Sequence, residues 1–255
     1  MHILLTNDDG VQAPGLLALA MALRALGEVT VFAPDRNWSA SGHVKTLHRP
    51  LRVDPVTLAD GSAALATDGA PSDCVALAVL GMVARPIDLV VSGINPHWNL
   101  GHDVTYSGTV TAAMEATIWN IPSLAVSTEH DEQIGYGPAA QVAAAVAGEV
   151  LKRGLPRNTL LNVNVPSAAA DSIKGVRVTR QGMRVYEDEL VSRVDPRGRP
   201  YYWIGGAPPT GVIEDGTGFA ALSEGWVSVT PLKLDLTAYE AMAEIDNWRW
   251  ESLAF

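Results

Sequence analysis

Oxygen-bearing side chains follow three separate apolar segments of the chain: an adjacent pair of carboxylates, then a serine hydroxyl, then an amide. Carboxylate, hydroxyl and amide oxygens are the hard ligands that Mg²⁺ and Mn²⁺ prefer, with water in the remaining positions. No set of His and Cys residues has the spacing of a zinc site. The sequence therefore predicts a site for a divalent cation, built from Asp8, Asp9, a hydroxyl of Ser39 or Ser41, and Asn95.

The carboxylate pair also has a purely structural interpretation. Asp8 or Asp9 could cap a helix that begins near Pro14 or satisfy a turn, and for an isolated pair this is the better explanation. Adjacent residues of a regular strand point to opposite faces, so both carboxylates can face one ion only if the strand has already ended. Gly10 permits such a turn. The loops that carry Ser39 and Asn95 favour the cation site.

Short apolar runs alternate with segments of helical period up to about residue 166. This pattern predicts an α/β fold, a Rossmann-like core over residues 1–170 in which helices flank a mostly parallel sheet. Ligands bind beyond the carboxyl ends of such strands, where the loops converge. Strands are expected at 2–7, 28–34, 62–68, 87–95, 121–128 and 159–166. Helices are expected at 14–27, 71–83, 107–120 and 137–154, with Ser72 placed to cap the second.

A possible anion site lies at the start of the third expected helix, at Ser107, Gly108 and Thr109. The first-turn N–H groups and the positive end of the helix dipole attract a phosphate, and two hydroxyls can add hydrogen bonds. An ordinary serine N-cap explains the same residues equally well. A cation beside a phosphate-sized site suits phosphomonoester hydrolysis, with Asp8 as the base that takes a proton from the attacking water.

The composition limits the classes of function. With 18 Lys and Arg against 28 Asp and Glu, the chain has no obvious basic face for a nucleic-acid polymer. A single cysteine, Cys74, allows no intrachain disulfide, which is typical of the cytoplasm. No secretory signal is visible, and the Ala-rich stretch 137–154 is interrupted by polar residues, so we expect no membrane span.

The chain changes character after Pro166. Residues 171–225 are rich in Gly, Pro and alternating strand-like residues and lack helical period, which predicts hairpins and an extended arm. Residues 226–255 contain a final strand and an amphipathic helix expected to return to the core or to a partner subunit.

Several ordered motifs resemble the SurE family of stationary-phase survival proteins, which are metal-dependent 5′- and 3′-nucleotidases. They are "ILLTNDDG", "APDRNWSASGHVKTLHRPLRV", "DGAPSDCVALA", "DLVVSGIN", "NLGHDVTYSGTV" and "IPSLAVS". The resemblance implies one divalent metal cation per subunit, Mg²⁺ or Mn²⁺, and a nucleoside monophosphate as substrate. It also implies a homo-oligomer, a dimer or a tetramer, in which the C-terminal arm is exchanged between subunits. The implied metal ligands are Asp8, Asp9, Ser39 and Asn95, and the implied phosphate contacts are Asn99, Ser107, Gly108 and Thr109.

Three departures from the family pattern concern the walls of the site. Pro96, His97 and Trp98 replace the small residues usual after the strand at 87–95, Thr111 stands where Gly is common, and Ala70 where Thr is usual. His97 and Trp98 could contact a nucleobase or could instead pack at a subunit contact. His43 could line the pocket, although a hydrogen-bonded structural histidine is the simpler interpretation.

Two other classes of function compete. A signalling receiver domain also keeps an acidic pair after its first strand, but it needs a phosphate-accepting Asp where this chain has Asn95. A nucleotide-binding protein without catalysis would use the same pocket. Haloacid-dehalogenase-like phosphatases need two Asp residues two positions apart, which "NDDG" lacks, so water attack is favoured over a covalent intermediate. The sequence leaves open the preference for 5′ or 3′ phosphate and an exopolyphosphatase side activity.

Overall fold

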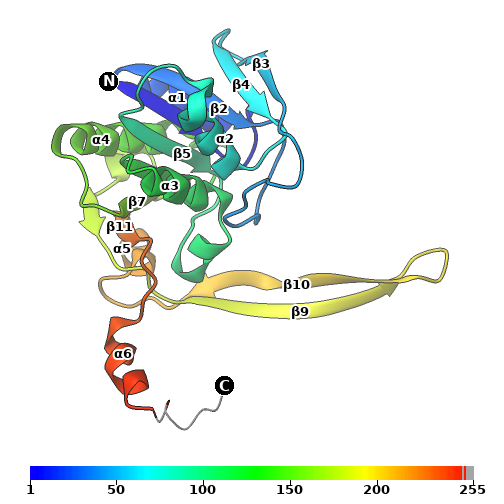
Figure 1. Cartoon of the computed structure of the whole chain (residues 1–255). Helices are drawn as coiled ribbons and strands as arrows, with labels where there is room; N and C mark the ends of the chain where they lie inside the picture. Colours follow the sequence, from blue (N-terminus) through cyan, green and yellow to red (C-terminus); the bar gives the residue numbers. More distant parts are fainter. Residues whose placement is uncertain (249, 251–255) are drawn as a thin grey trace.

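The computed structural model describes residues 1–248 and residue 250. Its centre is a nine-stranded sheet in the order β3-β4-β2-β1-β5-β6-β7-β11-β8 (Figure 1). The six strands from β4 to β7 in that order are parallel, whereas β3 pairs antiparallel with β4 and β11 pairs antiparallel with β7 but parallel with β8. The strands are β1 (His2–Thr6), β2 (Glu28–Pro34), β3 (Val53–Thr57), β4 (Ala63–Thr67), β5 (Leu89–Asn95), β6 (Ser123–Thr128), β7 (Thr159–Val165), β8 (Val176–Val178) and β11 (Val227–Lys233).

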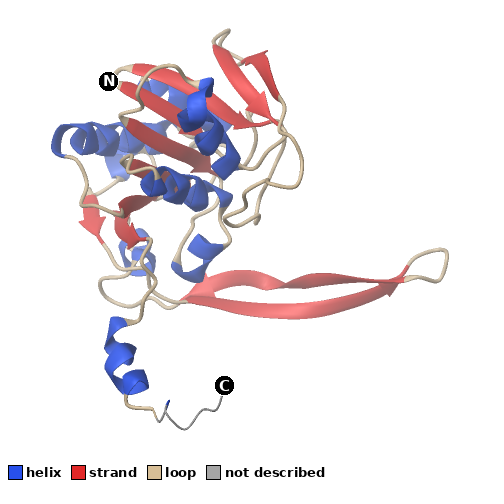
Figure 2. Cartoon of the chain, viewed as in Figure 1, coloured by secondary structure: helices blue, strands red, loops and turns tan. Residues whose placement is uncertain are grey.

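Helices cover both faces of this sheet (Figure 2). They are α1 (Pro14–Leu23), α2 (Pro71–Leu77), α3 (Gly108–Ile118), α4 (Gly137–Arg153) and α5 (Gly218–Ser223), whereas α6 (Tyr239–Asp246) lies away from the sheet. Ile3 and Leu5 of β1 point into the core that α1 and α4 cover, whereas Leu4 points into the core beneath α2 and α3. This alternation follows from the pleat of a strand and explains why β1 is apolar throughout. The predicted α/β fold with a mostly parallel sheet is confirmed.

The strand order reverses at β1. The chain runs from β1 to β2 on one side and later returns to β5 on the other side. The loops after β1 and β5 therefore leave the sheet side by side at its carboxyl edge. Such a reversal opens a crevice, which is where ligands bind in open α/β sheets. Asp8 and Asn95 both lie at this position.

The predicted cap of α2 by Ser72 is wrong. The N-cap residue is Ala70, whose backbone N–H donates to the carboxylate of Asp73 at 2.9 Å. The Ser72 hydroxyl instead donates to the carbonyl of Val44. Asp73 also accepts from the N–H and hydroxyl of Thr46, so one carboxylate supports the helix start and a neighbouring loop. A carboxylate three residues after an N-cap commonly bonds in this way.

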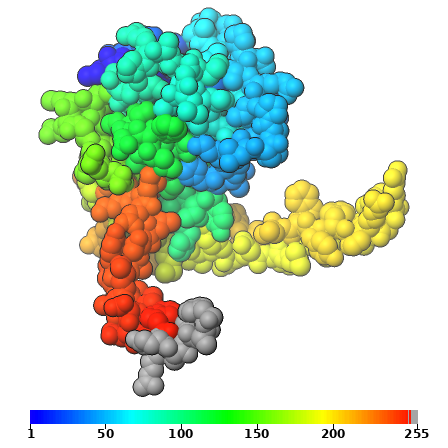
Figure 3. All heavy atoms as spheres, in the orientation of Figure 1, coloured from blue at the N-terminus to red at the C-terminus, as the bar shows by residue number. Residues whose placement is uncertain are grey.

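A long hairpin, β9 (Arg184–Val194) and β10 (Pro200–Gly211), leaves the body of the molecule and extends into solvent (Figures 1 and 3). It occupies only the middle of the predicted arm, since β8 before it is the edge strand of the main sheet and α5 after it contacts β7 and β11. Helix α6 follows β11 and has no buried residue. Residues 249 and 251–255, which close the predicted segment 226–255, lie outside the described residues. Among the described residues, no helix has the length and apolar character needed to cross a bilayer.

Candidate active site at the switch point of the sheet

A tight turn follows β1 and presents the acidic pair. The Asn7 side chain donates from Nδ2 to the carbonyl of Gly10 at 3.0 Å and accepts from the Gly10 N–H at 3.2 Å. Gly10 has φ of +105°, a conformation that side chains with a Cβ rarely adopt. The strand has therefore ended before Asp8, as the sequence predicted. Neither carboxylate caps α1, whose N-cap residue Ala13 has no side-chain hydrogen bond.

Asp8 lies against the first turn of α3. The Thr109 hydroxyl donates to Oδ1 of Asp8, and the backbone N–H groups of Thr109 and Gly108 further stabilise the charged carboxylate. Asp8 is 3% exposed. Gly108 permits this approach, because a Cβ at that position would lie 2.7 Å from the Cβ of Asp8. The amino end of α3 therefore already faces one anionic group of the protein.

The negative charges of Asp8 and Asp9 are not neutralised by a basic side chain in the described part of the chain. Burial raises the pKa of Asp8, and the bond from Thr109 only partly opposes this shift. Burial and then the charge of Asp8 raise the pKa of Asp9 to about 7, while His97 acts in the opposite direction. Within residues 1–248, neither carboxylate forms an ion pair with a basic side chain. Two desolvated carboxylates without a cation are a donor set that fits a metal ion.

The loop that carries Ser39 is attached at both ends to elements of the site. The Trp38 N–H donates to the carbonyl of Asp8 at 2.7 Å, and the Gly42 N–H donates to the carbonyl of Tyr106 at 2.9 Å. Thr111, one of the departures from the family pattern, donates its hydroxyl to the carbonyl of Gly42 at 3.1 Å. Ser39 itself is exposed. These bonds hold its loop between the end of β1 and the start of α3.

Asn95 ends β5, the strand that pairs with β1. Its Nδ2 donates to the carbonyl of His97 at 2.5 Å, so the side-chain oxygen is the atom that could bind a cation. No group of three or more His, Cys, Asp and Glu side chains in the described part of the chain could hold a metal. A metal ion at this place would therefore need hydroxyl and amide oxygens beside Asp8 and Asp9, which is the donor set expected from the sequence.

The predicted phosphate contacts lie at the same edge. Ser107 is the N-cap of α3, and its hydroxyl oxygen accepts from the Val110 N–H at 3.1 Å. This is the ordinary N-cap role that the sequence also allowed. Asn99 is 7% exposed and donates from Nδ2 to the Ser127 hydroxyl at 2.8 Å. The Asn99 N–H donates to Oδ1 of Asn164 at 2.9 Å. Two neighbouring strands, β6 and β7, thus fix the position of Asn99.

The residues proposed for the pocket wall have different surroundings. His97 is exposed, and its Nδ1 lies 2.8 Å from Oε1 of Glu129. Trp98 is half-buried and donates its indole N–H to the carbonyl of Val165 at 2.7 Å. The Nε2 atom of His43 lies 3.0 Å from Oε2 of Glu115 on α3, the hydrogen-bonded structural arrangement that the sequence also allowed.

Sequence reasoning missed the contribution of the loop after β6. Glu129 pairs with His97, and Tyr136 stacks on His130 with ring centroids 4.4 Å apart. Tyr136 is close enough to Asp9 that, after burial, the charge of that carboxylate raises the tyrosine pKa. Position in the sequence was the available signal. Glu129 and His130 follow the strand expected at 121–128, just as Asp8 follows the strand expected at 2–7 and Asn95 ends the one expected at 87–95.

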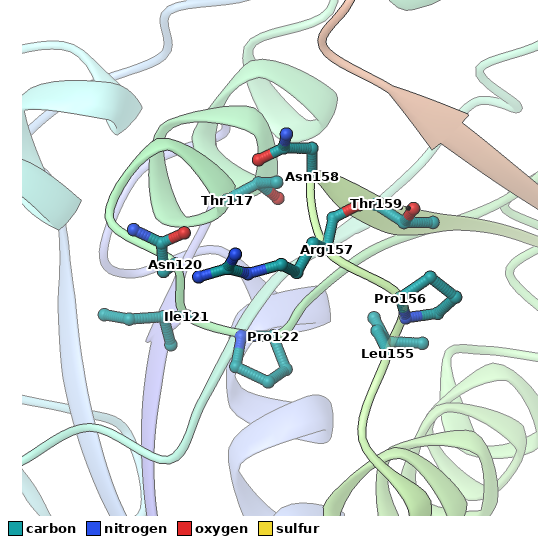
Figure 4. Close-up of a pocket in the computed structure, with 9 residues that line it drawn as sticks. All are labelled: Thr117, Asn120, Ile121, Pro122, Leu155, Pro156, Arg157, Asn158 and Thr159. Carbon is teal, nitrogen blue, oxygen red and sulfur yellow. Dashed lines mark hydrogen bonds between the residues drawn. The ribbon is translucent and has the colours of Figure 1, made fainter.

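A small cavity lies at the opposite edge of the sheet (Figure 4). It has a volume of about 150 Å³ and is bounded by the segments that precede β6 and β7, including Pro122 and Arg157. These segments lie at the amino ends of the parallel strands, away from the crevice where ligands bind in such sheets. The cavity is therefore separate from the acidic site.

The fold and the site define a doubly wound α/β protein with an acidic crevice at the switch point of its sheet. The model of the family "Survival protein SurE" matches residues 3–188. The chain belongs to the SurE family. It is 53% identical over 253 residues to the 5′-nucleotidase SurE of Chloroflexus aggregans, covering 98% of this chain and 100% of that protein. It is also 53% identical over 254 residues to the 5′-nucleotidase SurE of Herpetosiphon aurantiacus, covering 99% and 100%. The crystal structure of the SurE protein from Aquifex aeolicus superposes with a TM-score of 0.84 at 44% identity, covering 96% of this chain and 98% of that one.

Proposed function

We propose that this protein is a phosphomonoester hydrolase that releases phosphate from nucleoside 5′-monophosphates, with 3′-monophosphates as a second substrate class. The observation that carries the proposal is the pair Asp8 and Asp9, desolvated and without a basic partner in the described chain, beside the first turn of α3. The names of the relatives from Chloroflexus aggregans and Herpetosiphon aurantiacus support the same activity.

In this proposal Asp8, Asp9, Ser39 and Asn95 hold one divalent cation, Mg²⁺ or Mn²⁺. When bound, the cation offsets the charge of the phosphate and lowers the pKa of a water. The side chains of Asn99 and Ser107 and the N–H groups of Gly108 and Thr109 orient the phosphate. In the same proposal Asp8, at the centre of this site, accepts the proton of the attacking water.

The test is release of inorganic phosphate from AMP and GMP by the purified protein with Mn²⁺ or Mg²⁺. We expect activity that chelation abolishes and that Asp8→Asn lowers at least about 100-fold. Retention of full activity in either case would contradict the proposed mechanism. Nucleotide binding without phosphate release would support the non-catalytic alternative, which the names of the relatives do not favour.

We propose that the protein is a dimer or a tetramer and that the hairpin is exchanged between subunits. Leu190, Trp203 and Ile204 of the hairpin are 68%, 65% and 82% exposed, and a two-stranded hairpin alone is marginally stable in water. Exposed apolar surface of this kind marks interaction sites. We also propose a cytoplasmic location, because a chain with a single cysteine forms no intrachain disulfide and such chains are typical of reducing compartments.

A further inference from the structure

A second, larger cavity lies beside the acidic site. It has a volume of about 740 Å³, within the range of about 300–1,000 Å³ typical of small-molecule sites. Its floor is the apolar cluster of Leu100, Phe219 and Leu222, against which Trp98 packs. His97 and Glu129 lie at its rim. An apolar floor with a few polar groups at the rim suits a flat ring system that carries polar edges.

One segment of six residues connects this cavity to the proposed reaction site. Asn95, a proposed metal ligand, and Asn99, a proposed phosphate contact, lie on the same segment as the cavity residues His97, Trp98 and Leu100. A substrate held by its phosphate at Asn99 therefore has the cavity as its immediate neighbour. Because the phosphate is at one end of a nucleotide, the remainder of the molecule must extend away from the site.

The Trp98 ring is held in one orientation. Its indole N–H donates to the carbonyl of Val165 at the end of β7, and its ring packs on the Leu100 cluster. Arg184, which also lines the cavity, is fixed as well, because its Nε atom lies 2.9 Å from Oδ2 of Asp103 and its guanidinium lies over Phe219. A ring surface that is ordered before the ligand arrives loses little conformational entropy on binding.

We infer that this cavity is the nucleoside subsite and that the base of the substrate stacks on Trp98. The inference rests on the proposed function and deepens it. It assigns binding of the base to the segment after β5, where this chain departs from the small residues usual in the family. Stacking of a base on an aromatic side chain tolerates any base, so the subsite distinguishes nucleotides from other phosphomonoesters rather than one base from another.

The test compares AMP with ribose 5-phosphate, which has the same phosphate and sugar but no base. We expect wild-type kcat/KM to be at least about tenfold higher for AMP. Trp98→Ala should lower this ratio about tenfold, through KM for AMP, while kcat stays within about twofold. Trp98→Phe keeps a ring and should retain most of the preference. Trp226→Ala changes a half-buried tryptophan outside the cavity and should leave the ratio unchanged.

Trp98→Ala also removes a partly buried hydrogen bond and can destabilise the fold, so a second variant tests the subsite without that risk. Ile213 lines the cavity and is 70% exposed, and Ile213→Ser should lower the preference for AMP several-fold without unfolding the protein. If wild type cleaves both compounds equally, or if both variants leave the ratio unchanged, the subsite is wrong although the proposed function stands. If wild type releases phosphate from neither compound, the proposed function itself fails and the subsite with it.

Discussion

The hydroxyl of Thr109 donates a hydrogen bond to Oδ1 of Asp8, joining two residues that are 101 positions apart in the sequence. This bond connects the end of β1 to the first turn of α3. It stabilises the charged form of a carboxylate whose burial favours the neutral form.

Thr109→Val should therefore weaken cation binding at the site. The valine keeps the shape of threonine, but loss of the hydrogen bond raises the pKa of Asp8 further, so protons compete more strongly with the metal. We expect affinity for Mn²⁺ to fall about tenfold at pH 7, measured by isothermal titration calorimetry, with a smaller loss at pH 9. An affinity equal to wild type at both pH values would argue against this role of the hydroxyl.

Gly108→Ala should disrupt the site through packing. The new Cβ would lie 2.7 Å from Cβ of Asp8, so either the helix or the carboxylate must move. We expect a loss of about 1–3 kcal/mol in the free energy of unfolding and at least tenfold lower phosphatase activity. The control is Gly148→Ala on α4, where the nearest atom is Cδ2 of Leu26 at 3.6 Å. Helix propensity predicts that this control is neutral or stabilising by up to about 1 kcal/mol.

The stability of the metal-free protein should fall as pH rises. Asp9 has a pKa of about 7 in the folded chain, above its ordinary value of 3.8, so its neutral form is favoured by folding. That contribution is complete below about pH 4 and is lost as the pH rises through 7. We expect an effect on the order of 1 kcal/mol, after allowance for the partial exposure of Asp9.

Thermal unfolding in the presence of a chelator, measured from pH 5 to pH 8, checks this pH dependence. Asp9→Asn should show a flatter profile over the same range. Added Mn²⁺ should raise the melting temperature more at pH 8 than at pH 5, because the carboxylates are then charged. A metal-independent melting temperature at pH 8 would count against the cation site.

Glu115 should contribute to stability in the opposite pH direction. Burial alone would raise its pKa, but hydrogen bonds from His43, Lys45 and Trp119 outweigh burial and lower the value to about 2. Its contribution is present above its ordinary value of 4.5 and is lost as the pH falls toward 2. Glu115→Gln should cost about 1–3 kcal/mol at pH 7 and much less at pH 3, measured by urea unfolding. A constant difference across this range would exclude the charge as the cause.

Ile204→Lys on the hairpin should weaken self-association. A charged side chain in the centre of an apolar interface is strongly unfavourable. Light scattering of the wild type should show a dimer or a tetramer, and the variant should shift toward the monomer at micromolar concentrations. Leu47→Lys is the matched control, because Leu47 is 83% exposed, close to the 82% of Ile204, but lies outside the hairpin. A monomeric wild type would contradict the proposed exchange.

Strand and helix periodicity predicted most of the fold, because each expected strand up to residue 166 is apolar enough to be buried in a parallel sheet. The antiparallel edge strand β3 escaped prediction. Its sequence, "VDPVT", contains a proline and has no alternating apolar face, features that an edge strand tolerates and a central strand does not. Ser72 was expected to cap α2 because serine favours N-cap positions. The helix start is instead stabilised by Asp73, whose carboxylate accepts from the backbone N–H of the N-cap residue Ala70.

The position of the candidate site was also predictable, since parallel strands bring their following loops to one edge. The bonds that fix those loops were not. Trp38 and Gly42 act through backbone N–H groups, which leave no signature in the residue type. The proximity of Trp98 to Phe219 depends on how α5 returns to the body, and no local pattern encodes that return.

The two backbone anchors of the Ser39 loop have a consequence for protein engineering. Because Trp38 and Gly42 hold the loop through the main chain, the side chains of Arg36, Asn37 and Ala40 do not make these anchoring bonds. The Asn37 side chain accepts from the Ser39 N–H at 2.7 Å, and Ala40 has a φ of +57°, so these two positions shape the loop itself. Variation at Arg36 could therefore alter charge and shape around the crevice while the loop keeps its course. Evolution of new substrate ranges could proceed by the same route, with the supporting scaffold left intact.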